Sequence, residues 1–477
     1  MELHVVIHGK KDLSGQLYRQ LREAILSGRL KAGEQLPPTR LLAEQLGFSR
    51  KTVTEAYARL SYDNLLIGQA GTGTFINANI KTRAQQRKSE DLAGSAVVEH
   101  WRNIGPMLAH PVAGNLARYD FIGGATPKNL FPNEEWRRCM LHGLRQNAAM
   151  RGLYAPIEGL PPLREAIARH ISFSRGVRCT ADDVIITNGA QQALDLISRV
   201  LVVSGNVVAI EEPGYPPARQ LMTAQGAQVV GVPVDAEGII VEQIPDTARL
   251  IYVTPAHQFP LGMPMSEVRR RALLAKARDI GAIIMEDDYD SEFRYSGRPT
   301  DSLQSMDEDG IVAFVGTFSK TLSPELRIGY LIAPPALLNA VATAKKLSDS
   351  HTALTNQWAL LKFIDDGLLL KHIRRCHSVY ASRREKIEQR FADDLAPWFE
   401  LIPATAGFHL AARCRREIDI QLLIALAHRA EVGLYPLSFF YHYSEPQHGL
   451  LFGYGAIETL DIGPALDRVR DILTQIT

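Results

Sequence analysis

The sequence predicts an α/β protein whose main domain follows a smaller, mostly helical amino-terminal domain. From about residue 118 onward, short apolar runs typical of strands alternate with helical patterns, which favours a mostly parallel sheet covered by helices. Residues 12–78 instead contain three short helical patterns followed by two strand-like runs. Because 477 residues are too many for one ordinary core, two or three domains are expected.

The composition is that of an ordinary globular protein, with 46% apolar and 22% charged residues. No uninterrupted apolar run reaches the roughly 18 residues that a membrane span needs, and residues 1–4 do not resemble the start of a signal peptide. The four cysteines are far apart and lack the spacing of metal ligands. We therefore expect a cytoplasmic protein with no membrane contact, no disulfide framework and no metal site.

The charges are divided unevenly along the chain. Lys and Arg outnumber Asp and Glu in residues 1–90, whereas acidic residues outnumber basic ones in the remainder, although the net charge is only +1. A basic amino-terminal segment before a mildly acidic remainder indicates that the amino-terminal segment, residues 1–90, binds a polyanion.

The front contains a helix-turn-helix pattern. Apolar residues at helical spacing predict a first helix that stops at Gly28, and a second short helix starts near Thr39. After a tight turn, Ser49 is a good N-cap for a third helix, whose first turns carry cationic and hydroxyl residues on the face opposite its apolar stripe. In such motifs the start of the last helix meets base edges, while Arg and Lys neutralise phosphates.

Two strand-like runs, residues 65–69 and 74–76, follow this motif and predict a two-stranded wing. The glycine-rich turn between them would lie near a phosphate. The alternative is a helical interaction module whose charges are merely solvated. The combination of the motif, the wing and the local charge excess favours double-stranded DNA as the partner.

Residues 36–53 resemble the winged-helix domain of the GntR regulators, and the resemblance covers roughly residues 12–78. We therefore predict a DNA-binding domain at residues 1–78. Residues 79–115 lose periodicity and are rich in charge, which indicates an exposed linker with a short helix as an alternative. The resemblance implies DNA contacts by Arg40, Arg50, Lys51, Thr52, Thr54, Gly71 and Gly73.

Lys320 is the most informative residue of the main domain. It follows a strand-like run at residues 311–316, and burial at such a strand end would lower its pKa and free its amine as a nucleophile. Asp287 follows another such run, residues 282–285. A lysine that bonds covalently to the cofactor and an acid that keeps its ring nitrogen protonated are what a pyridoxal phosphate site requires. The blander alternative is a solvated loop lysine.

Other strand ends carry residues that suit the same cofactor. Residues 187–194 join a strand to a helix with small residues, so that backbone N–H groups can bind a phosphate. Tyr215, in a turn after a strand, would stack on a flat ring, with simple packing as the alternative. His257 lies in a strand-end loop whose polar groups would reach a ring substituent. Phosphate oxygens would also be held by Thr317, Ser319 and Arg327.

These motifs, in this order, resemble the fold type I aminotransferases, which depend on pyridoxal 5'-phosphate. Residues 286–293 and 316–320 are the most specific parts, and together with a GntR winged helix they match the MocR regulators over nearly the whole chain. The resemblance implies an aminotransferase-like effector and dimerisation domain at residues 116–477. It would comprise a large part with a mostly parallel sheet and a smaller C-terminal α+β part.

The resemblance also implies roles for individual residues. Lys320 would bond the cofactor, Asp287 would pair with its pyridine nitrogen, and Tyr289 would hydrogen-bond its phenolic oxygen. Tyr215 would stack on the ring, and Tyr154 would reach the phosphate of a neighbouring subunit, so a homodimer is expected. The implied phosphate cup comprises Gly189, Ala190, Gln191, Thr317, Ser319 and Arg327.

One departure from the aminotransferases bears on function. Leu451 stands about where they carry an arginine for the substrate α-carboxylate, although another arginine such as Arg219 would be a substitute. We therefore predict no catalytic residue. The expected protein is a regulator that senses pyridoxal phosphate, or its adduct with an amino compound, and controls genes of vitamin B6 or amino-acid metabolism. An active aminotransferase with an accessory DNA-binding domain is the alternative.

Overall fold

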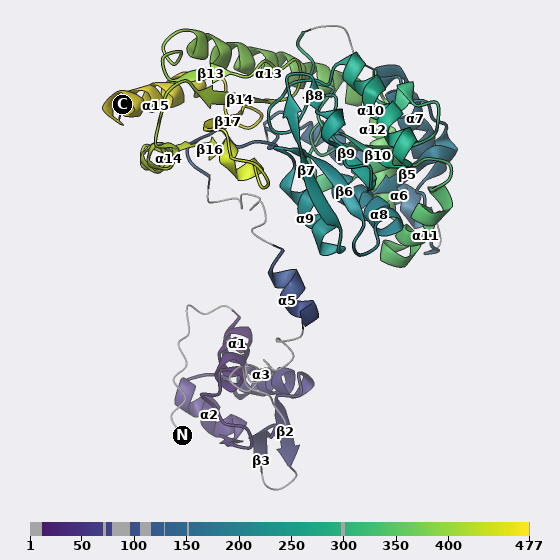
Figure 1. Cartoon of the computed structure of the whole chain (residues 1–477). Helices are drawn as coiled ribbons and strands as arrows, with labels where there is room; N and C mark the ends of the chain where they lie inside the picture. The colour runs from purple at the N-terminus through teal and green to yellow at the C-terminus, as the bar shows by residue number, and fades with distance from the viewer. Residues whose placement is uncertain are drawn as a thin grey trace. The chain divides into compact units, whose positions relative to one another are not determined.

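The computed structural model describes residues 12–69, 73–78, 96–104, 116–127, 129–149, 152–296 and 301–476. The chain divides into two compact units, Met1–Asn103 and Ile104–Thr477 (Figure 1). The described part of the expected linker contains one helix, α5 (Ala96–Arg102). The domain boundaries at residues 78 and 116 stay a prediction, because most of residues 79–115 lie outside the described ranges. Within those ranges, no helix is long and apolar enough to span a membrane.

The first unit is the expected winged helix-turn-helix. Leu17, Leu42, Val53 and Leu60 are fully buried in its core. The Ser49 hydroxyl accepts the Thr52 N–H at 3.2 Å and so caps the third helix, as expected. Its elements are the helices α1 (Leu13–Leu26), α2 (Thr39–Leu46) and α3 (Arg50–Tyr62) and the antiparallel strands β1 (Gln35–Leu36), β3 (Gly73–Ile76) and β2 (Leu66–Gln69), in that sheet order.

The second unit contains a mixed, mostly parallel sheet of eight strands, in the order β5-β12-β11-β10-β9-β6-β7-β8. Strand β12 runs antiparallel to both of its neighbours, and β8 runs antiparallel to β7. The strands are β5 (Val184–Thr187), β6 (Val207–Glu212), β7 (Gln228–Asp235), β8 (Gly238–Ile239), β9 (Ala248–Val253), β10 (Ile283–Asp288), β11 (Val312–Thr317) and β12 (Gly329–Ile332).

Helices cover both faces of this sheet (Figure 1). Alternation along a strand shows which helices lie on which face, because successive side chains point to opposite sides. Ile185 packs with the cluster of α8, α9 and α11, whereas Val184 and Ile186 pack with that of α6, α7 and α12. These helices and α10 are α6 (Asn133–Ala149), α7 (Pro161–Arg175), α8 (Ala190–Leu201), α9 (Pro216–Ala224), α10 (Glu267–Ile280), α11 (Leu338–Asp349) and α12 (Leu354–Asp365).

A smaller C-terminal α+β part completes the unit, as expected. Its sheet has the order β13-β14-β17-β16, and Phe399, Phe452 and Leu473 lie in its core. A short parallel pair, β4 (Tyr119–Asp120) with β15 (Val432–Gly433), joins it to the start of the unit. The other elements are α13 (Leu368–Ala392), β13 (Phe399–Leu401), β14 (His409–Cys414), α14 (Ile420–Arg429), β16 (Tyr435–Pro436), β17 (Gly449–Gly453) and α15 (Ile462–Ile476).

Candidate functional site

Two neighbouring strands bring Lys320 and Asp287 to one edge of the large sheet. Strands β10 and β11 pair in parallel with Asp287 opposite Val315, so their carboxyl ends meet. Lys320 follows the end of β11, and its Nζ donates a hydrogen bond to the Gly124 carbonyl oxygen at 2.7 Å. Burial lowers the pKa of Lys320, although Asp290 and Asp287 oppose this effect. A larger fraction of the amine is therefore neutral and nucleophilic.

Asp287 has one satisfied and one unsatisfied oxygen. Its Oδ2 accepts the Tyr252 hydroxyl at 2.8 Å, whereas its Oδ1 is buried without a hydrogen-bond partner. Burial raises the pKa of Asp287 to about 7, because the bond from Tyr252 offsets only part of the desolvation. A buried acceptor without a partner is costly. The Oδ1 atom is therefore suited to a ligand group that donates a hydrogen bond.

Tyr289 and His257 belong to a buried polar cluster beside this edge. The Tyr289 hydroxyl donates to the His257 carbonyl oxygen at 2.9 Å, and Nδ1 of His257 lies 2.9 Å from Asp290 Oδ1. The His409 ring lies 4.5 Å from that of His257. Side-chain atoms of His257, Asp290 and His409 lie within 4.8 Å of one another, a spacing that suits a metal ion. Nδ1 of His257 pairs with Asp290 and Nε2 of His409 donates to the Pro260 carbonyl oxygen, whereas Nε2 of His257 is buried without a hydrogen-bond partner.

The residues of the expected phosphate cup come from the ends of three neighbouring strands and the start of a helix. Thr317 of β11 lies opposite Gly329 of β12, which lies opposite Thr187 at the end of β5. Helix α8 begins directly after Gly189, so its free N–H groups and positive dipole end are at this edge. Arg327 joins the group, because its Nη2 donates to the carbonyl oxygen of Asn188 at 2.7 Å. Residues predicted from separate motifs are therefore brought together.

Two glycines are required at this turn. Gly189 has a φ of 79°, and a Cβ there would lie 2.9 Å from the guanidinium of Arg327. A Cβ on Gly329 would lie 2.7 Å from the backbone of Gly189. The sequence analysis did not predict Gly329 as a site residue. Its position two residues after Arg327 is the only sequence feature that could have indicated it.

Thr317 and Ser319 bond to each other. The Ser319 N–H donates to Thr317 Oγ1 at 3.1 Å, and the two hydroxyl oxygens are 3.0 Å apart. Tyr215 is the residue directly before α9, and its ring meets that of Phe259 edge-on, with 5.6 Å between ring centroids. Tyr154 is 84% exposed and contacts His351, with 5.8 Å between ring centroids. The contact of Tyr154 with the phosphate site of a partner subunit stays a prediction.

Leu451 occupies the middle of β17 and is 2% exposed. Its Cδ2 lies 3.0 Å from the position of a Cβ on Gly123, the residue before the Gly124 whose carbonyl holds Lys320. An apolar side chain therefore stands beside the Lys320 edge where the resemblance expects an arginine. Arg219, the proposed substitute, lines a small hollow with Glu212 and His442.

Most of the predicted DNA-contacting residues that the structure describes are exposed on the first unit. Arg50, Lys51 and Thr54 are exposed in the first turns of α3, while Thr52 is half-buried. Arg40 is exposed on α2. Gly73 starts β3 with a φ of 128°, whereas Gly71 lies outside the described residues.

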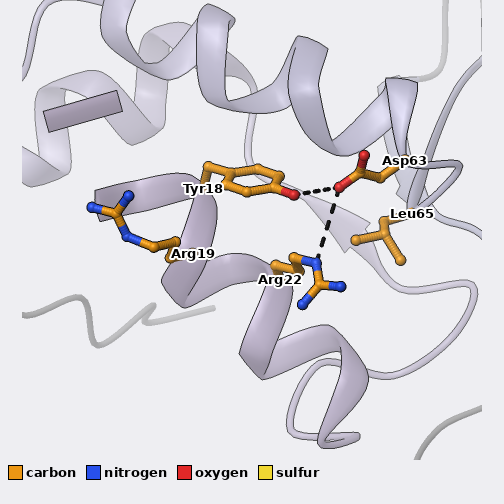
Figure 2. Close-up of a pocket in the computed structure, with 5 residues that line it drawn as sticks. All are labelled: Tyr18, Arg19, Arg22, Asp63 and Leu65. Carbon is orange, nitrogen blue, oxygen red and sulfur yellow. Dashed lines mark hydrogen bonds and ion pairs between the residues drawn. The ribbon is translucent and has the colours of Figure 1, made fainter. Parts of the chain in front are cut away.

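The same unit has an open hollow of about 550 Å³ between α1 and the end of α3, which sequence reasoning missed (Figure 2). The Tyr18 hydroxyl donates to Asp63, and Arg22 lies 4.0 Å from the same carboxylate. Arg59 covers the Tyr18 ring at 4.2 Å. These contacts join α1 to the end of α3.

Both units match known families. The model of bacterial regulatory proteins of the gntR family matches residues 13–76, and that of aminotransferase class I and II matches residues 125–449. The chain is 36% identical over 457 residues to the probable rhizopine catabolism regulatory protein MocR of Rhizobium meliloti (95% of this chain, 92% of that one). It is 29% identical over 470 residues to the pyridoxine biosynthesis transcriptional regulator PdxR of Corynebacterium glutamicum (98% and 96%).

A solved structure is similar to the second unit. Kynurenine aminotransferase of Pyrococcus horikoshii, in complex with PMP, shares 26% sequence identity with the chain. The TM-score is 0.70, and the match covers 82% of this chain and 96% of that one. The fold type I aminotransferase architecture expected from the sequence is therefore confirmed.

A GntR winged helix followed by an aminotransferase class I and II domain defines a class of DNA-binding transcriptional regulators. The chain belongs to that class, in the MocR subfamily of the GntR regulators, as its motifs indicated.

Members of the aminotransferase class I and II family bind pyridoxal 5'-phosphate, and the residues of this chain fit that group. The unpartnered Oδ1 of Asp287 suits a protonated ring nitrogen, and Lys320 supplies the amine. The turn at Gly189, with the start of α8 and Arg327, suits a phosphate. The cofactor's aldehyde would supply the covalent link to this lysine.

Proposed function

We propose that the chain is a transcriptional regulator that binds promoter DNA through its winged helix and senses pyridoxal phosphate, or its adduct with an amino compound, through Lys320. The observation that carries this proposal is the buried oxygen of Asp287 that has no hydrogen-bond partner. Asp287 lies on β10, next to the strand β11 that Lys320 follows. Such an oxygen is costly unless a ligand satisfies it. The exposed basic start of α3 in the same chain supports DNA as the partner.

Each residue at the site has a proposed task. Lys320 bonds the cofactor and Asp287 keeps its ring nitrogen protonated, while Tyr289 hydrogen-bonds the phenolic oxygen and Tyr215 stacks on the ring. His257 holds Tyr289 through its carbonyl oxygen. Residues of three strand ends hold the phosphate: Gly189, Ala190, Gln191, Thr317, Ser319 and Arg327.

Sensing is favoured over transamination by Leu451. A buried leucine beside Gly123 cannot orient a substrate carboxylate by paired charge-assisted hydrogen bonds. An active aminotransferase remains the second candidate, since Lys320 and Asp287 are both in place. An aromatic-amino-acid aminotransferase of Thermococcus litoralis, 29% identical over 366 residues, also supports that candidate.

The regulator is proposed to act as a cytoplasmic homodimer, with Tyr154 completing the partner's phosphate site and two winged helices meeting paired half-sites. The relatives are named for rhizopine catabolism and for pyridoxine biosynthesis. We place the regulated genes of this chain in vitamin B6 or amino-acid metabolism. The regulator would have a DNA-binding and a non-binding arrangement. The ligand can change the affinity for DNA only as far as it binds one of these arrangements more tightly than the other.

The direct test is promoter binding titrated with pyridoxal phosphate at fixed salt. Promoter fragments that the full chain retains from its own genome are used, and the apparent Kd is measured by fluorescence anisotropy. We expect the Kd for DNA to change by roughly fivefold or more between cofactor-free and saturated protein, in the range typical of allosteric coupling. An unchanged Kd with demonstrably bound cofactor would contradict the sensing role.

We further expect no sustained conversion of amino acid to keto acid by the saturated protein. The reason is that Leu451 supplies no guanidinium for the α-carboxylate. Keto acid formation is followed over many equivalents of protein with a panel of amino acids and an amino acceptor. An authentic aminotransferase serves as control, and steady turnover at its rate would reverse the order of the two candidates.

A further inference from the structure

Helix α11 carries a lysine whose charge is buried. The Lys345 side chain is 0% exposed, and its Nζ lies 2.9 Å from Asp349 Oδ1, one helical turn later. Burial lowers the pKa of Lys345, while Asp349 acts in the opposite direction. A buried ion pair costs desolvation, and replacement by apolar residues is often neutral or stabilising. A gain in stability alone therefore does not explain the Lys345–Asp349 pair.

The carboxylate of Asp349 has two further partners, which stand on either side of the phosphate turn. Its Oδ2 accepts Nδ2 of Asn188 at 2.7 Å and Nε2 of Gln192 at 2.8 Å. Gln192 Oε1 in turn accepts the Asn188 N–H at 2.7 Å. One carboxylate outside the turn thus holds both residues that flank Gly189, Ala190 and Gln191.

The same network reaches the guanidinium that is expected to bind phosphate. The carbonyl oxygen of Asn188 accepts Nη2 of Arg327 at 2.7 Å. Lys345 provides a second link, because its Nζ donates to Thr352 Oγ1 at 3.1 Å. That hydroxyl donates to the Ile186 carbonyl oxygen in β5 at 3.3 Å. The end of α11 is therefore fastened to the end of β5 at two points.

The ion pair of Lys345 with Asp349 also reduces the repulsion between the Asp349 carboxylate and a bound phosphate. A lone carboxylate beside an anion site would repel a phosphate, and more strongly where water is excluded. The Lys345 ammonium offsets that charge at 2.9 Å. Asp349 can then serve as a hydrogen-bond acceptor for Asn188 and Gln192 without a net negative charge near the turn.

We propose that Asp349 and Lys345 are positioning residues for the cofactor's phosphate: they hold the turn at residues 188–192, and through Asn188 the guanidinium of Arg327, in a phosphate-binding arrangement. The inference rests on the proposed cofactor binding at Lys320 and deepens it. Neither residue is assigned contact with the ligand. The alternative is that the pair merely packs α11 against the sheet.

The two explanations differ for a ligand without a phosphate. Full-length protein is titrated with pyridoxal phosphate and with pyridoxal, and lysine-bound ligand is followed by its visible absorption. In the charge-neutral double variant Lys345→Met/Asp349→Asn, we expect the Kd for pyridoxal phosphate to rise about tenfold or more. The Kd for pyridoxal should stay within about twofold. An equal change for both ligands, or no change for either, would overturn the proposal.

A second variant and a control complete the design. Asn188→Ala leaves the buried ion pair intact and removes the side chain that Asp349 holds, so the same selective loss is expected. If the double variant does not fold, the Asn188→Ala variant alone tests whether the turn is held for phosphate binding. Asp366→Asn breaks an exposed pair of the same spacing, with Lys362 at 2.8 Å, and should change neither Kd. Wild-type protein that binds neither ligand would instead refute the proposed function itself.

Discussion

Replacement of Lys320 by alanine is expected to abolish covalent cofactor binding. Protein with the Lys320→Ala substitution should show no visible absorption band of lysine-bound ligand at any concentration of pyridoxal phosphate, and its promoter binding should no longer respond to the cofactor. The expected effect is complete, because Lys320 is the buried amine close to Asp287 that is proposed to bond the cofactor. Absorption spectra and anisotropy titrations measure the two losses.

The matched control is Lys346→Ala. Lys346 is an exposed lysine on α11, and its loss removes the same charge without touching the site. It should leave both the absorption band and the DNA response unchanged. Persistence of the band in the Lys320 variant would place the covalent link on another amine.

The ionisation of Lys320 adds a pH dependence to this prediction. Burial lowers its pKa, so a neutral amine is available at lower pH than for an exposed lysine. The visible band should therefore form with pyridoxal phosphate at pH values where a free lysine amine reacts poorly. A rate of band formation that matches free lysine across the pH range would contradict the assignment.

The core of the site was predictable because its residues sit in local motifs. Lys320 and Asp287 each follow an apolar run, and the rule that ligands bind at the carboxyl ends of parallel strands brings them together without coordinates. Gly189 was predicted for the same reason, as a small residue between a strand and a helix. These are features of ten or fewer consecutive residues.

The supporting residues could not be found in that way. Gly329 enters the site because the four-residue strand β12 inserts antiparallel between β11 and β5, and no periodicity in so short a run reveals the pairing. Asp349 contacts Asn188 across a sequence separation of 161 residues. His409 reaches the cluster of Tyr289 from the C-terminal sheet. Such contacts depend on how elements pack, which a single sequence does not encode locally.

In the fold, too, elements with a local sequence pattern were predicted, whereas those that depend on long-range pairing were not. Helices α1, α2 and α3 were predicted from apolar spacing and caps, and the Ser49 cap is present. Strand β1 was not predicted, because its two residues show no alternation; its strand character comes from the pairing of Gln35 with Phe75. Long-range pairing again decided what local pattern could not.

Loss of the two cations at the start of α3 is expected to have the largest effect on DNA binding. The variants Arg50→Ala and Lys51→Ala each remove one exposed charge from the first turn of α3. A phosphate contact should weaken binding to all sequences and reduce the salt slope by about one. A base contact should cost about 1–3 kcal/mol and relax specificity at one position. Binding isotherms over a salt series, on promoter and on scrambled DNA, separate these outcomes.

Arg59→Ala is the control on the same helix. Arg59 is exposed near the other end of α3 and covers the Tyr18 ring at 4.2 Å, so its loss removes one cation from α3 without changing the first turn. It should lower thermal stability slightly and leave the salt slope nearly unchanged. If Arg50→Ala and Lys51→Ala left promoter affinity and salt slope as in the wild type, the start of α3 would not be the DNA-contacting surface. Equal losses from all three variants would indicate a general charge effect instead of a recognition helix.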